Sequence, residues 1–277
     1  MTISKIIFTT VLFINLLLTA TYSHADSTIS LNSNQGNAIL SIKNDFISLK
    51  PADPEDVIQL EDFSANEALF HTPTQTLYII DHEQAAISTL TKTYIDQLSN
   101  TLNAANDILN AIPDDQRDTL SGLMNGLGIN VPEPQNSNSL TTLEATSIQE
   151  FRGITCQESN LVAEDKVHGQ ICITQGNSTS LSNNDYENLV ILQSFLLNIA
   201  KQAAPFAQQY ELSIPNLDGI EVDGLLVNSN IQSQIQVNNQ PQTVNSHFVV
   251  TGINNETIDE ISLPSNYQSK PLSIPQN

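Results

Sequence analysis

Short segments with apolar residues at alternate positions recur through most of the chain. Between residues 28 and 90 they are separated by turn-forming groups such as Asn34-Gln35-Gly36 and Lys43-Asn44-Asp45. Near the other end, the isoleucines and the valine between Ile231 and Val237 alternate with glutamines. A period of two is typical of a strand that buries one face, and closely spaced turns favour antiparallel neighbours. The main expectation is therefore an antiparallel sheet.

Other segments have apolar residues at every third or fourth position, as in amphipathic helices. The first, from Thr93 to Pro113, carries Ile95, Leu98, Leu102, Ala105, Leu109 and Ile112 on one stripe. A long helix is also expected from a Ser182 cap to about Tyr210, with Leu189, Leu192, Leu196, Ile199 and Phe206 on its buried stripe. A short helix is expected over 114–127. Strands together with two long helices and one short helix predict an α+β fold.

The first 25 residues have the order of a secretory signal peptide. Lys5 precedes an apolar run from Ile6 to Leu18, and Ser23-His24-Ala25 follows with small residues at the positions that signal peptidase reads. The apolar run is shorter than the roughly 20 residues of a membrane span, and no later segment approaches that length. We expect cleavage between Ala25 and Asp26, and a soluble periplasmic or secreted protein.

The remaining residues, 26–277, are expected to form a single domain with a loose tail from about residue 264. The full sequence has a formal net charge of −21, which repels nucleic acid and anionic lipid headgroups. No nucleic-acid partner and no integral membrane segment after signal removal are therefore expected.

Cys156 and Cys172 are the two cysteines of the chain. They lie in two predicted strands, Phe151–Val162 and Val167–Thr174, joined by a turn at Ala163–Lys166. If the hairpin pivots at Glu164, the cysteines face each other directly at about 4.5 Å between Cα atoms. In an oxidising compartment such a pair forms a disulfide. A redox-active pair would more often have two residues between its cysteines, and this spacing is absent.

Motifs for metal, cofactor or catalytic chemistry are incomplete. His82 begins half of a zinc-protease motif, but Ala86 stands where the second histidine belongs. Asp218–Gly224 is rich in acids without the spacing of a calcium loop, so a weak calcium site there is left open. A nucleophile elbow, a serine–lysine dyad and a dinucleotide-binding fingerprint are absent. We therefore expect no enzyme activity, no cofactor and no metal site, with a hydrolase built on an unrecognised acidic pair as an alternative.

Three short segments resemble a known family. Leu77–Asp81 is a hairpin strand before the first expected helix. Phe151–Cys156 contains Gly-x-x-Cys with Cys172 as its partner, and Leu263–Tyr267 contains Pro-x-x-Tyr after the closing strand. Together with the order of elements behind a signal peptide, they resemble the LolA-like superfamily of periplasmic proteins, especially its members of unknown function. The resemblance implies a strongly curved antiparallel sheet, an incomplete barrel closed by the helices, with an apolar concave side.

By the same resemblance, the function would be non-enzymatic binding of a lipid-like or acylated ligand, or of an exported partner. The apolar residues predicted to line the ligand cavity are Leu98, Leu102, Leu109, Leu192, Leu196, Ile199, Ile79 and Phe248. Alternatively, these residues pack into a closed core. The protein would then be an extracytoplasmic assembly or surface-interaction protein, with an exposed apolar patch or a free sheet edge in place of a cavity.

The signal peptide gives the first testable prediction. Protein recovered from the extracytoplasmic fraction should have the mass of a chain that begins at Asp26, because signal peptidase cleaves after small residues such as Ala25. Intact-mass spectrometry measures this directly. A recovered chain that still carries Met1 would contradict the prediction.

Overall fold

The computed structural model describes residues 26–34, 36–53, 58–60, 63–97, 99–100, 141–209, 212–213, 220–237 and 240–271. The predicted signal peptide and its cleavage site lie almost entirely outside these residues, with Asp26 the first residue described. Most of the first predicted helix and all of the short helix over 114–127 also lie outside them.

Strands dominate the described part of the chain. The first group comprises β1 (Ser27–Ser33), β2 (Gly36–Lys43), β3 (Phe46–Pro51), β6 (Glu67–His71), β7 (Thr76–Asp81) and β8 (Ala86–Thr91). The second group comprises β9 (Thr142–Phe151), β10 (Ile154–Ala163), β11 (Lys166–Thr174), β12 (Leu212–Ser213), β13 (Leu225–Val237), β14 (Gln240–Asn255) and β15 (Gln268–Ser269). Strands β4 (Ile58–Leu60) and β5 (Phe63–Ala65) form a separate pair.

The two groups form one sheet of thirteen strands. Its order is β15-β8-β7-β6-β3-β2-β1-β14-β13-β11-β10-β9, with β12 attached to β13. The two groups are joined where β1, near the beginning of the chain, pairs with β14, near its end, and β15 of the second group adds to the outer edge of β8. All neighbours are antiparallel except β15 and β8, which are parallel. The sheet ends at β15 on one side and at β9 on the other.

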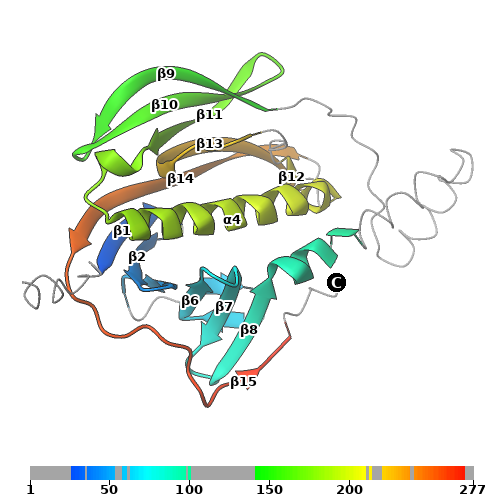
Figure 1. Cartoon of the computed structure of the whole chain (residues 1–277). Helices are drawn as coiled ribbons and strands as arrows, with labels where there is room; N and C mark the ends of the chain where they lie inside the picture. Colours follow the sequence, from blue (N-terminus) through cyan, green and yellow to red (C-terminus); the bar gives the residue numbers. More distant parts are fainter. Residues whose placement is uncertain are drawn as a thin grey trace, which may run out of the picture.

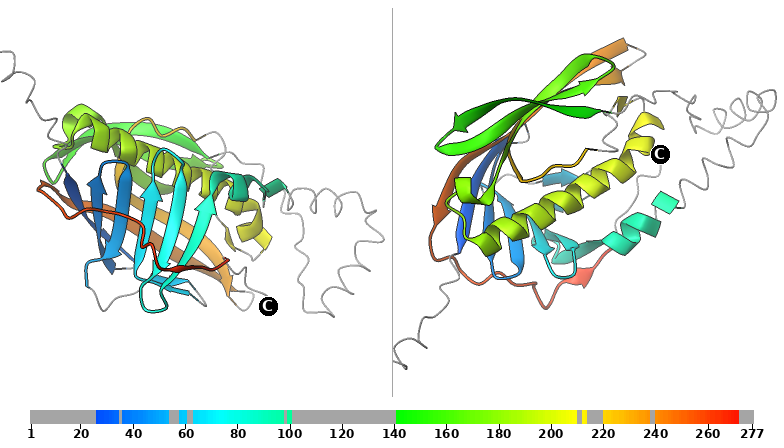
Figure 2. Two further views of the ribbon diagram at one scale, coloured as in Figure 1. Left: turned by 60° about the horizontal axis from the view of Figure 1, so that its bottom comes forward. Right: turned by 45° about the horizontal axis from the view of Figure 1, so that its top comes forward.

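One long helix, α4 (Asn183–Gln209), lies along the inner side of this sheet, which curves around it (Figures 1 and 2). Its expected cap is confirmed, because the backbone N–H of Asp185 donates to Ser182 Oγ at 3.1 Å. The other described helical residues are the 3₁₀ turn η1 (Gly176–Ser178) and residues 92–97 and 99–100. Gln202 of α4 donates to Asp96 Oδ1 at 3.0 Å, which links the helical residues after β8 to α4.

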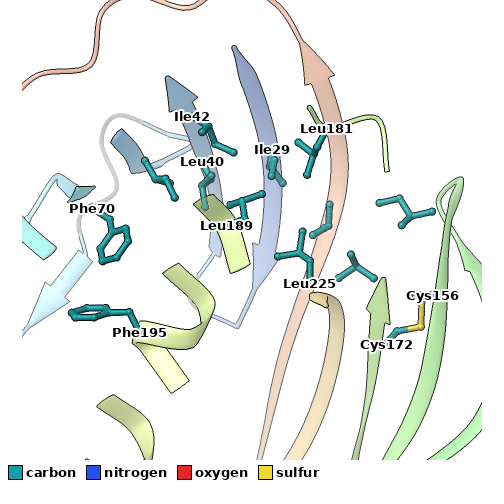
Figure 3. Close-up of a cluster of buried hydrophobic side chains, with 14 of the residues drawn as sticks. Ile29, Leu40, Ile42, Phe70, Cys156, Cys172, Leu181, Leu189, Phe195 and Leu225 are labelled. Carbon is teal, nitrogen blue, oxygen red and sulfur yellow. A yellow bond between two sulfur atoms is a disulfide. The ribbon is translucent and has the colours of Figure 1, made fainter. Parts of the chain in front are cut away.

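The core lies between α4 and the sheet (Figure 3). Leu189 and Phe195 of α4 are buried against side chains from both strand groups. The ring of Phe195 packs on Phe70 of β6 with centroids 5.1 Å apart. Ile29, Leu40, Ile42, Ile154, Leu225, Val227 and Val250 belong to the same cluster. One continuous apolar cluster therefore holds the two strand groups and α4 together.

The predicted fold class is wrong. The sequence predicts a curved antiparallel sheet closed by two long helices and one short helix. The chain is instead mostly strand, the sheet is not closed, and the described part contains one long helix. The strands were underestimated because pairing continues beyond the apolar stretches: β13 and β14 extend through runs of Gln, Asn, Ser and Thr. Backbone hydrogen bonds maintain a strand where alternation of apolar residues is weak.

Cys156 and Cys172 form a disulfide with 5.5 Å between their Cα atoms. The predicted pairing of the cysteines is confirmed, but the predicted register is wrong. Cys172 lies opposite Glu158, and the bond is diagonal. The pivot was expected at Glu164, but the turn has two residues, Glu164 and Asp165, and an irregularity between Leu161 and Val162 shifts the register by one further position. Such a bulge inserts an extra residue and gives little signal in a sequence.

The segment after Pro264 was expected to be loose, yet its described part binds the sheet. The backbone N–H groups of Gln268 and Lys270 donate to the carbonyls of Ala85 and Ile87 at 2.8 and 2.9 Å. Tyr267 OH lies 2.8 Å from His82 Nδ1, in hydrogen-bonding contact. The tail is therefore bound to β8 and its preceding turn as far as Lys270.

The disulfide gives a stability prediction. Replacing both cysteines by serine should lower the free energy of unfolding by about 3 kcal/mol, because the bond closes a loop of 16 residues that is otherwise open in the unfolded chain. Denaturant titration measures the loss. Wild-type protein in reductant is the matched control and should show a similar loss; equal stability of all three samples would contradict the prediction.

Candidate functional site

Five of the eight residues predicted to line a ligand cavity lie in the described part of the chain, and they differ in burial. Leu192, Ile199 and Phe248 are partly buried against the core cluster. Ile79 is buried outside that cluster, and Leu196 is 47% exposed. Leu98, Leu102 and Leu109 lie outside the described residues. The hydrophobic cavity stays a prediction.

Strand β9 forms one end of the sheet and is a long edge strand. It has ten residues and pairs with β10, and no described segment pairs with its outer side. Every residue from Glu144 to Glu150 is exposed, and Ile148 is 73% exposed. The opposite end of the sheet, β15, has two residues. Among the described strands, β9 thus offers a long row of backbone donors and acceptors at a sheet edge.

A two-residue turn places β9 at this edge. Arg152 and Gly153 have φ values of 50° and 81°, the left-handed conformation that tight hairpins require. The turn joins β9 to β10, whose Ile154 and Cys156 are buried in the core cluster. The disulfide connects β10 to β11 in turn. Strand β9 is therefore held in place by backbone pairing with β10, which is fixed to the core. Few of the apolar side chains of β9 are themselves buried.

A bulge divides β9 near its middle. Thr146 and Ser147 share the position opposite Glu158, where the register with β10 shifts. Both hydroxyls donate to Glu158 Oε2, at 3.2 and 3.4 Å. Because a bulge twists the strand locally, it interrupts a regular ladder along the outer edge. The edge is therefore most regular in two short stretches, 142–145 and 148–151.

The sequence analysis missed β9, because it extended the cysteine strand back to Phe151. In fact Phe151 ends β9, and the next strand begins at Ile154. The available signal was the Arg152-Gly153 pair between two segments of alternating residues. A glycine at the second position is typical of a two-residue hairpin turn.

His82 lies in a polar cluster that the incomplete zinc motif did not predict. Its Nε2 is 2.9 Å from Glu67 Oε2, and Ser48 Oγ donates to the other oxygen of that buried carboxylate at 2.5 Å. Tyr267 OH lies at the opposite ring nitrogen of His82. Within the described residues, no group of three or more His, Cys, Asp or Glu side chains is arranged to hold a metal ion. The cluster attaches the C-terminal segment to the sheet.

Two shifted pKa values accompany contacts of the helices. A hydrogen bond from Lys92 and a second from Gln202 lower the pKa of the exposed Asp96 carboxyl. Burial, together with the nearby charge of Asp223, raises the pKa of the Tyr186 hydroxyl, which donates to the carbonyl of Thr174 at 3.2 Å. Both shifts follow from contacts within or beside the helices.

Comparison with known proteins adds no family assignment: neither a family model nor a curated protein matches the chain. In the described part, no helix combines the length and the apolar character needed to cross a membrane.

The exposure of β9 gives a paired stability prediction. Ile148→Thr should change the free energy of unfolding by less than about 0.5 kcal/mol, because the side chain lies outside the core. Phe195→Ala should cost about 3–5 kcal/mol, because it leaves a cavity between α4 and the sheet. Urea titration of both variants checks this contrast. A loss of several kcal/mol for the first variant would show that β9 is packed against something.

Proposed function

We propose that this chain is a non-enzymatic extracytoplasmic interaction protein that binds an extended segment of a partner protein along the outer edge of β9. The observation that carries the proposal is the exposed ten-residue edge strand, which has no described neighbour on its outer side. Unpaired N–H and C=O groups at such an edge accept an added strand, and side chains on alternate positions add specificity.

Charge determines which partner suits this edge. Glu144 and Glu150 are exposed on β9, and Glu158 of the adjacent strand holds the bulge. Two copies of the chain paired edge to edge would bring these carboxylates together, with a net charge of −21 on each chain. Like charges across a strand pair are destabilising, whereas opposite charges stabilise. The proposed partner is therefore a different protein, with lysine or arginine beside an apolar residue that contacts Ile148.

The extracytoplasmic setting is supported by the disulfide, since such bonds persist in oxidising compartments. Periplasmic residence and the LolA-like relationship are part of the proposal and rest on the sequence. Binding of a lipid-like ligand, which the resemblance also implies, stays an alternative proposal. The free outer edge of β9 favours an interaction protein, because its backbone groups can pair with a strand of a partner.

A pair of synthetic peptides tests the proposal. Each peptide is about ten residues long, alternates threonine and valine to favour an extended strand, and carries two lysines or two glutamates. We expect the lysine peptide to slow deuterium exchange of the amides in β9, and to bind roughly threefold to tenfold more tightly than the glutamate peptide. Exchange read by mass spectrometry locates the binding site.

Charge-reversed variants provide the control. Glu144→Lys with Glu150→Lys should reverse the preference between the two peptides. Glu256→Lys with Glu260→Lys changes the total charge equally, at exposed residues outside β9, and should leave the preference unchanged. Protection outside β9, or the same response from both double variants, would overturn the proposal.

A further inference from the structure

A polar pocket lies beneath the turn between β9 and β10. Its volume is about 370 Å³, and it opens between this turn, the segment from Asn177 to Ser180, and β14. Ile154, Val250 and Ile253 form apolar parts of its wall, and all three belong to or pack against the core cluster. A concave site with an apolar wall and several polar groups has the form of a small-ligand site.

The charge of this pocket is opposite to that of the chain. The sequence contains 30 acidic residues and 9 lysines and arginines. None of the lining residues is acidic, and Arg152 supplies a positive charge. An anion that reaches the pocket therefore meets a guanidinium with no carboxylate on the lining.

No described residue forms an ion pair or a hydrogen bond with the guanidinium of Arg152. Some other cations form ion pairs: Lys43 with Asp26 at 3.0 Å, and Lys92 with Asp96 at 2.9 Å. Within the described residues, Arg152 makes no ion pair or hydrogen bond through its side chain, and it stands over the ring of Phe151 at 5.9 Å from the centroid. Contact with an aromatic face orients a guanidinium and leaves its N–H groups free to donate.

Further donors stand on the opposite wall. Ser178 Oγ donates to Asn177 Oδ1 at 3.4 Å, and the Asn177 amide nitrogen has no acceptor in the described part. The hydroxyl of Ser180 likewise has no hydrogen bond to a described residue, while its carbonyl accepts from Asn255. Arg152 on one side and an amide and a hydroxyl on the other can surround a planar anion.

We propose that this pocket binds a carboxylate that carries a short apolar group. The fork of Arg152 matches the two oxygens of a carboxylate, Asn177 and Ser180 supply further donors, and Ile154 with Val250 contacts the apolar group. Either a free organic acid or the C-terminal carboxylate of a peptide provides this chemistry. Binding at this pocket does not depend on strand addition at β9.

Matched probes distinguish these sources and test the proposal. Butyrate represents a free acid, N-acetyl-dialanine a peptide terminus, and the corresponding amides lack the charge. Titration followed by two-dimensional NMR should shift the amide signals of Gly153, Ser180 and Gly252 with at least one acid and with neither amide. A response to both butyrate and N-acetyl-dialanine indicates that the pocket recognises the carboxylate whichever molecule carries it. A response to N-acetyl-dialanine without a response to butyrate indicates recognition of a peptide terminus.

Variants at matched surface cations complete the experiment. Arg152→Gln should weaken binding of the acid about tenfold or more, because it removes a charged donor. Asn177→Asp should abolish binding by adding a like charge. Lys166→Gln, in the neighbouring hairpin, removes an exposed cation outside the pocket and should leave binding unchanged. Equal binding of acids and amides, no effect of Arg152→Gln, or no shift with any probe at about 10 mM would overturn the proposal.

Discussion

In the described part of the chain, one long helix covers the inner face of a sheet of thirteen strands, and the rest of the described structure depends on the extent of this contact. The 27 residues of α4 span about 40 Å, whereas twelve strands side by side span about 50 Å. The helix is about 10 Å wide, so the apolar cluster it completes lies at the centre. The ends of the sheet are held by other means: the C-terminal segment pairs with β8, and the disulfide joins β10 to β11. Beyond the disulfide, β9 is left exposed.

The sequence predicts the parts of the fold in which side-chain pattern and backbone structure agree. Strand β1 has alternating apolar residues and β7 has a short apolar run, and α4 has both a stripe and a Ser182 cap. The cysteine pairing was also predictable from compartment and spacing. In contrast, β9 has one strongly apolar residue in its centre, Ile148, so its pattern resembles a loop. Its position depends on pairing with β10, which a single sequence does not reveal.

The candidate sites were harder to predict than the strands, because each combines residues that are distant in the sequence. The polar pocket joins Arg152 to Asn177 and to Val250, and only the curved sheet brings them together. His82 meets Glu67 and Tyr267 in the same way. The bulge at Glu158 and the shifted register at the cysteines have no pattern in the sequence. The turn at Arg152-Gly153 connects β9 to the pocket. Its glycine is the one local residue in the sequence that indicates a hairpin turn at this position.

Position-dependent crosslinking tests most directly whether β9 is the surface that meets a partner. A photo-reactive residue placed at Ile148, and separately at Val167, is expressed in the native extracytoplasmic compartment. Both side chains are well exposed, at 73% and 56%, but Val167 belongs to an interior strand. We expect a discrete adduct from Ile148, attached to an extended partner segment that contains lysine or arginine, and no corresponding adduct from Val167. Equal adducts from the two positions, or none from Ile148, would contradict this expectation.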